Sequence, residues 1–144
     1  MNQKSASIEK RVINYIAFIF GTIHHVKGRR YIMETGVGEK IYIASSKIHN
    51  YKNYRASWQA VNWGILEETD YYCQIIEDKG FVLIPTQVLR EISKHTCSDE
   101  RRFFVSVRFN DGVELQTRRG LNNISLKYYY HPIDLISYEE IMAA

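Results

Sequence analysis

The chain has 144 residues, the length of one domain, and this is enough to bury a sizeable core. Apolar residues make up 45% of it and charged residues 24%, as in ordinary globular proteins, and no apolar run is long enough to cross a bilayer. The formal net charge of +3 permits a nucleic-acid partner without requiring one. Because residues 1–9 are polar and Cys73 and Cys97 lack CxxC spacing, we expect a cytoplasmic protein with reduced thiols and no membrane segment.

The first predicted element is a helix that Ser5 or Ser7 can cap and that Gly21 ends. Its apolar positions recur at helical spacing and are Ile8, Val12, Tyr15, Ile16 and Ile19. Extended segments follow at roughly 22–27, 30–34 and 40–46, separated by glycine-containing turns. A second helix is expected from Ser57 to Leu66.

The second half predicts two hairpins around a short helix. Strands at about 70–77 and 81–84 are joined by a tight turn, and Thr86 can cap a helix after Pro85. Strands 102–109 and 113–117 flank Asn-Asp-Gly, a good hairpin signal. The order predicts an α/β (α+β) domain over residues 1–144, with a central mixed sheet flanked by helices and a C-terminal hairpin and extension over 98–144.

Four polar residues lie where these elements could expose them. Ser45 and Lys47 project from one face of the strand 40–46 and its end, because side chains alternate along a strand. Glu34 ends the preceding strand, and a flat hairpin would place it and Lys47 at opposite ends. The two meet only if the strands are splayed or offset. Glu9 heads the apolar row of the first helix, either as an ordinary first-turn acid or as a site residue.

These residues resemble the PD-(D/E)xK nuclease superfamily, in particular the branch of small homing endonucleases and Holliday-junction resolvases. The helix glutamate matches Glu9 in SIEKRV, the strand acid matches Glu34 in YIMETG, and the acid-x-lysine pair falls on Ser45 and Lys47. The stretch TDYYCQIIEDKGFVLIPTQVL is similar to the strand-turn-strand-Pro-helix of many bacterial members. The resemblance covers roughly residues 5–95 and implies a restriction-endonuclease-like fold.

The resemblance implies a catalytic set of Glu9, Glu34, Ser45 and Lys47, with Glu9 and Glu34 binding Mg²⁺ or Mn²⁺. Such a cation can supply hydroxide and stabilise the leaving oxygen, while the lysine orients or deprotonates the attacking water. Ser45 stands where the superfamily has an acid. Either Glu67 or Glu68 replaces that acid, or the protein is a non-catalytic relative.

Three clusters of basic and aromatic residues are candidates for DNA contact. The segment KIHNYKNYR contributes His49, Tyr51, Lys52, Tyr54 and Arg55; VKGRRY contributes Lys27, Arg29 and Arg30; and TRRG contributes Arg118 and Arg119. Each cluster by itself is also typical of a solvated hairpin end, but three such clusters in one small domain favour a nucleic-acid partner.

Three functions follow. The first is a metal-dependent endonuclease that hydrolyses phosphodiester bonds in double-stranded or branched DNA, for example a homing endonuclease. It would act as a homo-oligomer, either a dimer or a tetramer. The second is a non-catalytic DNA-binding relative. The third is a mobile-element or phage-type protein inhibitor, in which the 11 tyrosines serve a protein interface.

Overall fold

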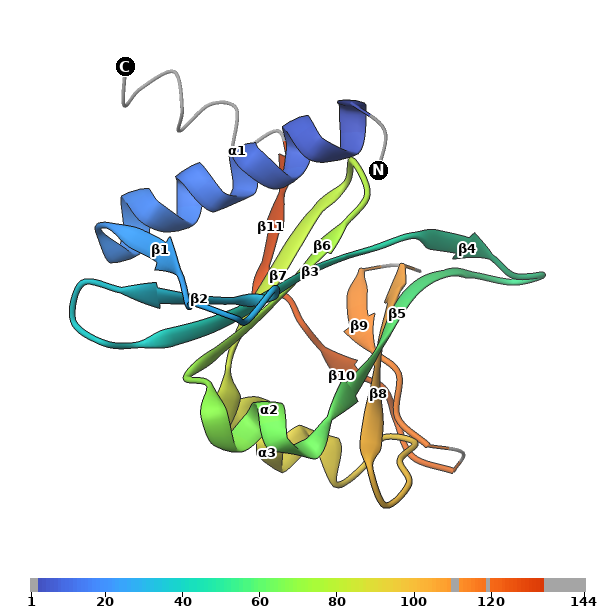
Figure 1. Ribbon diagram of the computed structural model, residues 1–144. Coiled ribbons are helices and arrows are strands. Elements are labelled where there is room, and N and C mark those ends of the chain that lie inside the picture. The colour runs from blue at the N-terminus through green and yellow to red at the C-terminus, as the bar shows by residue number, and fades with distance from the viewer. Residues whose placement is uncertain (1–2, 110–111, 119, 134–144) are drawn as a thin grey trace.

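The computed structural model describes residues 3–109, 112–118 and 120–133 (Figure 1). Three helices occur in these ranges: α1 (Gln3–Phe20), α2 (Trp63–Glu68) and α3 (Thr86–Ser93). The strands are β1 (Ile23–His25), β2 (Ile32–Thr35), β3 (Lys40–Ser46), β4 (Ile48–Asn50), β5 (Arg55–Asn62), β6 (Tyr71–Ile76), β7 (Gly80–Pro85), β8 (Arg102–Phe109), β9 (Val113–Leu115), β10 (Ile124–Ser125) and β11 (Tyr130–Pro132).

The strands form two sheets. Sheet A has the order β1-β2-β3-β6-β7-β11, and its neighbouring strands are antiparallel except for the parallel pair β3 and β6. Sheet B has the order β10-β9-β8-β5-β4 and is antiparallel throughout. A parallel pair needs a long crossover connection, and here the crossover from β3 to β6 carries β4, β5 and α2.

Sheet A is buried on both faces. On one face it packs against α1, where Val12, Ile16, Ile41 and Phe81 belong to one apolar cluster. On the other face it packs against sheet B, α2 and α3 in a second, larger cluster. Figure 1 shows α1 lying across sheet A, away from sheet B. The strands β3, β6 and β7 therefore carry apolar residues in nearly continuous runs, as strands buried on both faces do.

A cluster of buried polar side chains joins the two sheets where the chain leaves β3 for β5. Gln74 accepts a hydrogen bond from Tyr72 Oη at 2.7 Å, and its amide nitrogen donates to Ser46 Oγ and to the carbonyl of Ser57, each at 3.1 Å. Ser46 and Ser57 also share a hydrogen bond. Burial raises the pKa of the Tyr72 hydroxyl well above its ordinary value, so the hydroxyl stays a donor.

The α+β class predicted from the sequence is confirmed, as are most of the predicted elements. The strand 40–46, the helix after Pro85, the strand 102–109 and the end of α1 at Gly21, whose φ is +83°, all lie where expected. However, α1 begins at Gln3 and includes Ser5 and Ser7, so neither serine caps it. Of the predicted C-terminal region, residues 110–111, 119 and 134–144 lie outside the described ranges.

Two predictions about the fold are wrong. Residues 55–62 form strand β5 instead of the first half of a helix, and only Trp63–Glu68 is helical. The spacing of Ser57 and Val61 fits one face of a helix and one face of a strand equally well. Because β5 pairs along its whole length with β8, tertiary pairing selects the strand. As a result the later strands build a second sheet, where the sequence predicted one central sheet.

Candidate nucleic-acid interface

Two of the four predicted catalytic residues meet. Ser45 Oγ donates a hydrogen bond of 3.4 Å to Glu9 Oε2, which links the exposed end of β3 to α1. Lys47 follows directly after β3 and is exposed. The structure therefore gathers one carboxylate and one hydroxyl on the α1 side of sheet A, beside a solvated lysine.

Glu34 lies away from this pair, as expected for a flat hairpin and in contrast to the shared site that the resemblance implies. It pairs with Lys40, five residues before Ser45 along β3, which corresponds to roughly 16 Å. It also projects from the opposite face, because its neighbour Met33 packs with α1 and side chains alternate. On its own face Glu34 contacts His24, with 3.5 Å between Oε1 and Nε2.

The predicted metal site is therefore not assembled from Glu9 and Glu34. Within residues 3–109, 112–118 and 120–133, no group of three or more His, Cys, Asp or Glu residues is placed to hold a metal ion. Neither predicted substitute for the missing acid lies beside Ser45. The carboxylate of Glu68 pairs with Arg29, and Glu67 is on the same short helix, next to the start of β6. The start of β6 pairs with Ile41, near the other end of β3.

The three predicted basic clusters come from separate elements. The first cluster, with Lys27, Arg29 and Arg30, lies exposed in the turn between β1 and β2 of sheet A. In this turn Arg29 forms an ion pair with Glu68. The guanidinium carbon of Arg30 lies 5.3 Å from the centre of the Tyr31 ring. Arg118 is exposed after β9, and Arg119 lies outside the described residues. Sequence reasoning therefore identified the residues but did not show which cluster belongs to an extended surface.

The third cluster, KIHNYKNYR, forms the hairpin of β4 and β5 at the edge of sheet B. In Figure 1 this hairpin projects beyond the rest of the molecule. Tyr51 and Tyr54 stack at its tip with ring centroids 4.9 Å apart. The guanidinium of Arg108, from β8, lies 3.6 Å from the centre of the Tyr54 ring. The nitrogen Nε of Arg108 is buried without a hydrogen-bond partner among the described residues, so the ring supplies the charge compensation.

The hairpin continues into the outer face of sheet B, which we define by the side chains directed away from sheet A. Alternation along β8 places Arg102, Phe104, Ser106 and Arg108 on this face, since Phe103, Val105 and Val107 are in the core. Trp58 lies on the same face because it pairs with Ser106. Arg55 pairs with Phe109 and therefore belongs to the opposite face.

Aromatic rings cross the outer face of sheet B diagonally from strand to strand. The ring of Trp58 stacks on His49 with a centroid separation of 6.2 Å and meets the edge of Phe104 at the same separation. Arg102 lies 5.3 Å from the Phe104 ring while its Nε lies 3.5 Å from Asp99 Oδ2. Trp58 is 45% exposed, so it belongs to the surface of sheet B and not to the core.

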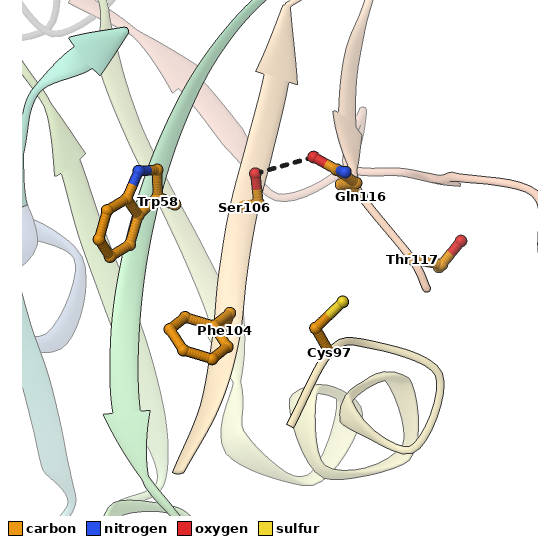
Figure 2. A pocket seen from close by; sticks show the side chains of 6 residues that line it. All are labelled: Trp58, Cys97, Phe104, Ser106, Gln116 and Thr117. Atoms are coloured by element: carbon orange, nitrogen blue, oxygen red, sulfur yellow. Dashed lines mark hydrogen bonds between the residues drawn. The ribbon is translucent and has the colours of Figure 1, made fainter. Parts of the chain in front are cut away.

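A shallow pocket of about 230 Å³ opens on this face (Figure 2). Its lining residues are Trp58, Cys97, Phe104, Ser106, Gln116 and Thr117. Figure 2 shows Trp58 on one side, Phe104 and Ser106 at the centre, and Gln116, Thr117 and Cys97 on the other. Ser106 Oγ donates a 3.2 Å hydrogen bond to Gln116 Oε1, and this bond orients the amide of Gln116.

Sequence reasoning missed Arg102, Phe104 and Arg108 as members of this candidate surface. The signal was present in RFFVSVRF, where one alternating set is apolar and the other reads Arg, Phe, Ser, Arg. The aromatic of this second set, Phe104, is half-buried and lies between two arginines on the same face of the strand. What the sequence did not reveal is that β5 and β4 lie beside β8 and bring Trp58, His49 and Tyr54 to the same surface.

In the part of the chain that the structure describes, no helix combines the length and apolar character needed to span a membrane. Comparison of the chain with protein-family models, curated proteins and solved structures gives no match.

Proposed function

We propose that the protein binds nucleic acid through the outer face of sheet B and the adjoining β4–β5 hairpin. The observation that carries this proposal is the placement of aromatic rings and guanidinium groups on one exposed face. Rings of this kind stack on bases, and cations beside them neutralise phosphates. The partner predicted from the sequence, DNA, is kept, and its main contact is now assigned to the hairpin cluster.

Tyr51 and Tyr31 offer a matched test, because their exposed fractions are 45% and 44% and each lies beside one of the predicted basic clusters. We expect Tyr51→Ala to weaken binding of a labelled DNA oligonucleotide about tenfold, the loss typical of one stacked base, and Tyr31→Ala to leave it unchanged. Fluorescence anisotropy measures both affinities. A loss confined to Tyr31→Ala would move the interface to the β1–β2 turn.

Lys52 tests the electrostatic part of the proposal. The affinity should fall steeply between about 50 and about 200 mM salt, because phosphate contacts release counterions. Lys52→Ala should reduce the slope of log K against log[salt] by about 1, whereas Lys10→Ala on α1 should not change it. DNA affinity that does not respond to salt, or no affinity at all, would favour the protein-inhibitor alternative.

The endonuclease is the second candidate, and the contact between Glu9 and Ser45 beside Lys47 is the observation that favours it. Incubation with supercoiled plasmid and branched DNA, with and without Mg²⁺, tests it directly. Binding without metal-dependent nicking is the expected result, since Glu34 lies on the other face of sheet A. Nicking that requires Mg²⁺ and is lost in Lys47→Ala would establish the endonuclease. The homo-oligomer and the cytoplasmic location remain predictions.

A further inference from the structure

The outer face of sheet B carries a pocket in addition to flat aromatic rings, and the pocket has the features of a binding site for one planar group. Its two ring-bearing residues, Trp58 and Phe104, come from neighbouring strands, and their rings meet edge to face at 66°. Both rings line the pocket, and Trp58 is 45% exposed, so part of its ring surface is open to a third flat group. The volume of about 230 Å³ is below the range of about 300–1,000 Å³ typical of drug-sized ligands, so the pocket suits part of a larger ligand.

The polar wall of the pocket offers hydrogen-bond donors. Gln116 uses its carbonyl oxygen to accept from Ser106, and its Nε2 makes no hydrogen bond to any described residue. Both N–H groups of that amide are therefore available to acceptors on a ligand. Thr117 Oγ1 is already occupied, because it donates to the carbonyls of Leu121 and Asn122. A flat ligand with ring-edge acceptors matches this wall.

The charges around the pocket favour an anionic ligand. Arg102 lies beside the Phe104 ring, Arg108 is on the same strand face, and Arg118 follows Thr117 directly. Two acids stand nearby: Asp99 contacts Arg102, and Glu114 pairs with Arg108 across the strands. Three arginines against two acids leave a surplus of one positive charge among these residues on and beside the outer face of sheet B.

We infer that this pocket holds one unpaired nucleobase, so that the protein selects single-stranded over duplex nucleic acid. This inference rests on the proposed function and adds its substrate class. A base in a duplex presents only its edge in the grooves, whereas an unpaired base can place its face on the ring of Trp58 and its edge against Phe104 and Gln116. A phosphate next to this base then lies near Arg102, whose guanidinium lies beside the Phe104 ring.

Binding of three probes distinguishes this inference from the proposed function. The probes are a short labelled single strand of mixed sequence, its blunt duplex, and the same single strand with abasic sites in place of the bases. We expect the single strand to bind at least about tenfold more tightly than either of the others. Equal, salt-sensitive binding of single strand and duplex would overturn the base pocket and leave the proposed function standing. No binding of any probe would overturn both.

Gln116→Ala tests the polar wall, with Gln87→Ala on the exposed side of α3 as its matched control. Gln116→Ala should weaken binding of the single strand about fivefold and leave duplex binding unchanged, because only an unpaired base reaches the amide. Phe104→Leu, which keeps an apolar side chain of similar bulk but removes the flat ring, should reduce the preference for single strands. If neither variant changes that preference, the base does not occupy this pocket.

Discussion

Gln74 is one of the residues that connect the two sheets through side-chain hydrogen bonds. It is fully buried, and it satisfies Tyr72 on its own strand, Ser46 on β3 and the backbone of Ser57 on β5. A buried polar group is tolerated only when it is paired, and the Tyr72 hydroxyl has its acceptor in this amide. The residue therefore fixes where the chain crosses from sheet A to sheet B.

Replacing Gln74 with leucine should destabilise the protein by about 1–3 kcal/mol, because the buried hydroxyl of Tyr72 loses its acceptor. The free energy of unfolding in urea measures the loss. The double variant Gln74→Leu/Tyr72→Phe should be more stable than Gln74→Leu alone, since removal of both partners leaves no unpaired hydroxyl. A double variant less stable than the single one would show that the cost comes from packing.

Strands β7 and β11 meet at a position that only glycine can occupy. Gly80, at the start of β7, has a φ of +153°, and a Cβ built there would lie 2.2 Å from the carbonyl oxygen of His131 and 2.9 Å from Cα of Pro132. Both contacts are with backbone, which cannot turn away as a side chain can. The pairing of β11 with β7, and with it the edge of sheet A, depends on this close approach.

Gly80→Ala should therefore lower the free energy of unfolding by about 2 kcal/mol or more, through displacement of β11. Gly36→Ala, in the turn between β2 and β3, is the control: its Cβ would meet no atom within 4 Å, so the change should stay within about 0.5 kcal/mol. Urea denaturation followed by far-UV circular dichroism compares the two. Equal stabilities would mean that β11 does not hold the position described.

Sheet A is shared by both apolar clusters of the molecule. One face packs against α1, and the other against sheet B and the two short helices. A loss of packing under α1 is therefore transmitted through sheet A to the remainder of the fold. For this reason we expect the described domain to unfold as one cooperative unit.

Ile16→Ala tests this cooperativity. Ile16 is a fully buried residue of α1, whereas both tryptophans lie outside α1, in β5 and α2. The substitution should cost about 2–5 kcal/mol and shift the unfolding midpoint equally by tryptophan fluorescence and by circular dichroism. The exposed neighbour Ile19, changed to alanine, should shift neither midpoint appreciably. Separate midpoints for the two probes would show that α1 unfolds independently of sheet B.

The local elements of this chain could be predicted because their signals are short-range. Glycine at 21 ends α1, alternation defines the strand 102–109, and the turn after Ile76 joins β6 to β7. The contact of Glu9 with Ser45 joins two of the predicted site residues. The same reasoning failed for residues 57–66, where helical and strand spacing coincide and only the partner strand β8 decides between them.

The sequence by itself determined the α+β class, the positions of most elements and the basic and aromatic character of KIHNYKNYR, because propensity and alternation are properties of neighbouring residues. Only the tertiary structure decided that Glu34 lies on the opposite face of sheet A from Glu9, and that Trp58, Phe104 and Arg108 share a surface with the hairpin. Both outcomes depend on which strands pair and in which register. A shift of one residue moves a side chain to the other face, so composition and spacing along the chain cannot fix them.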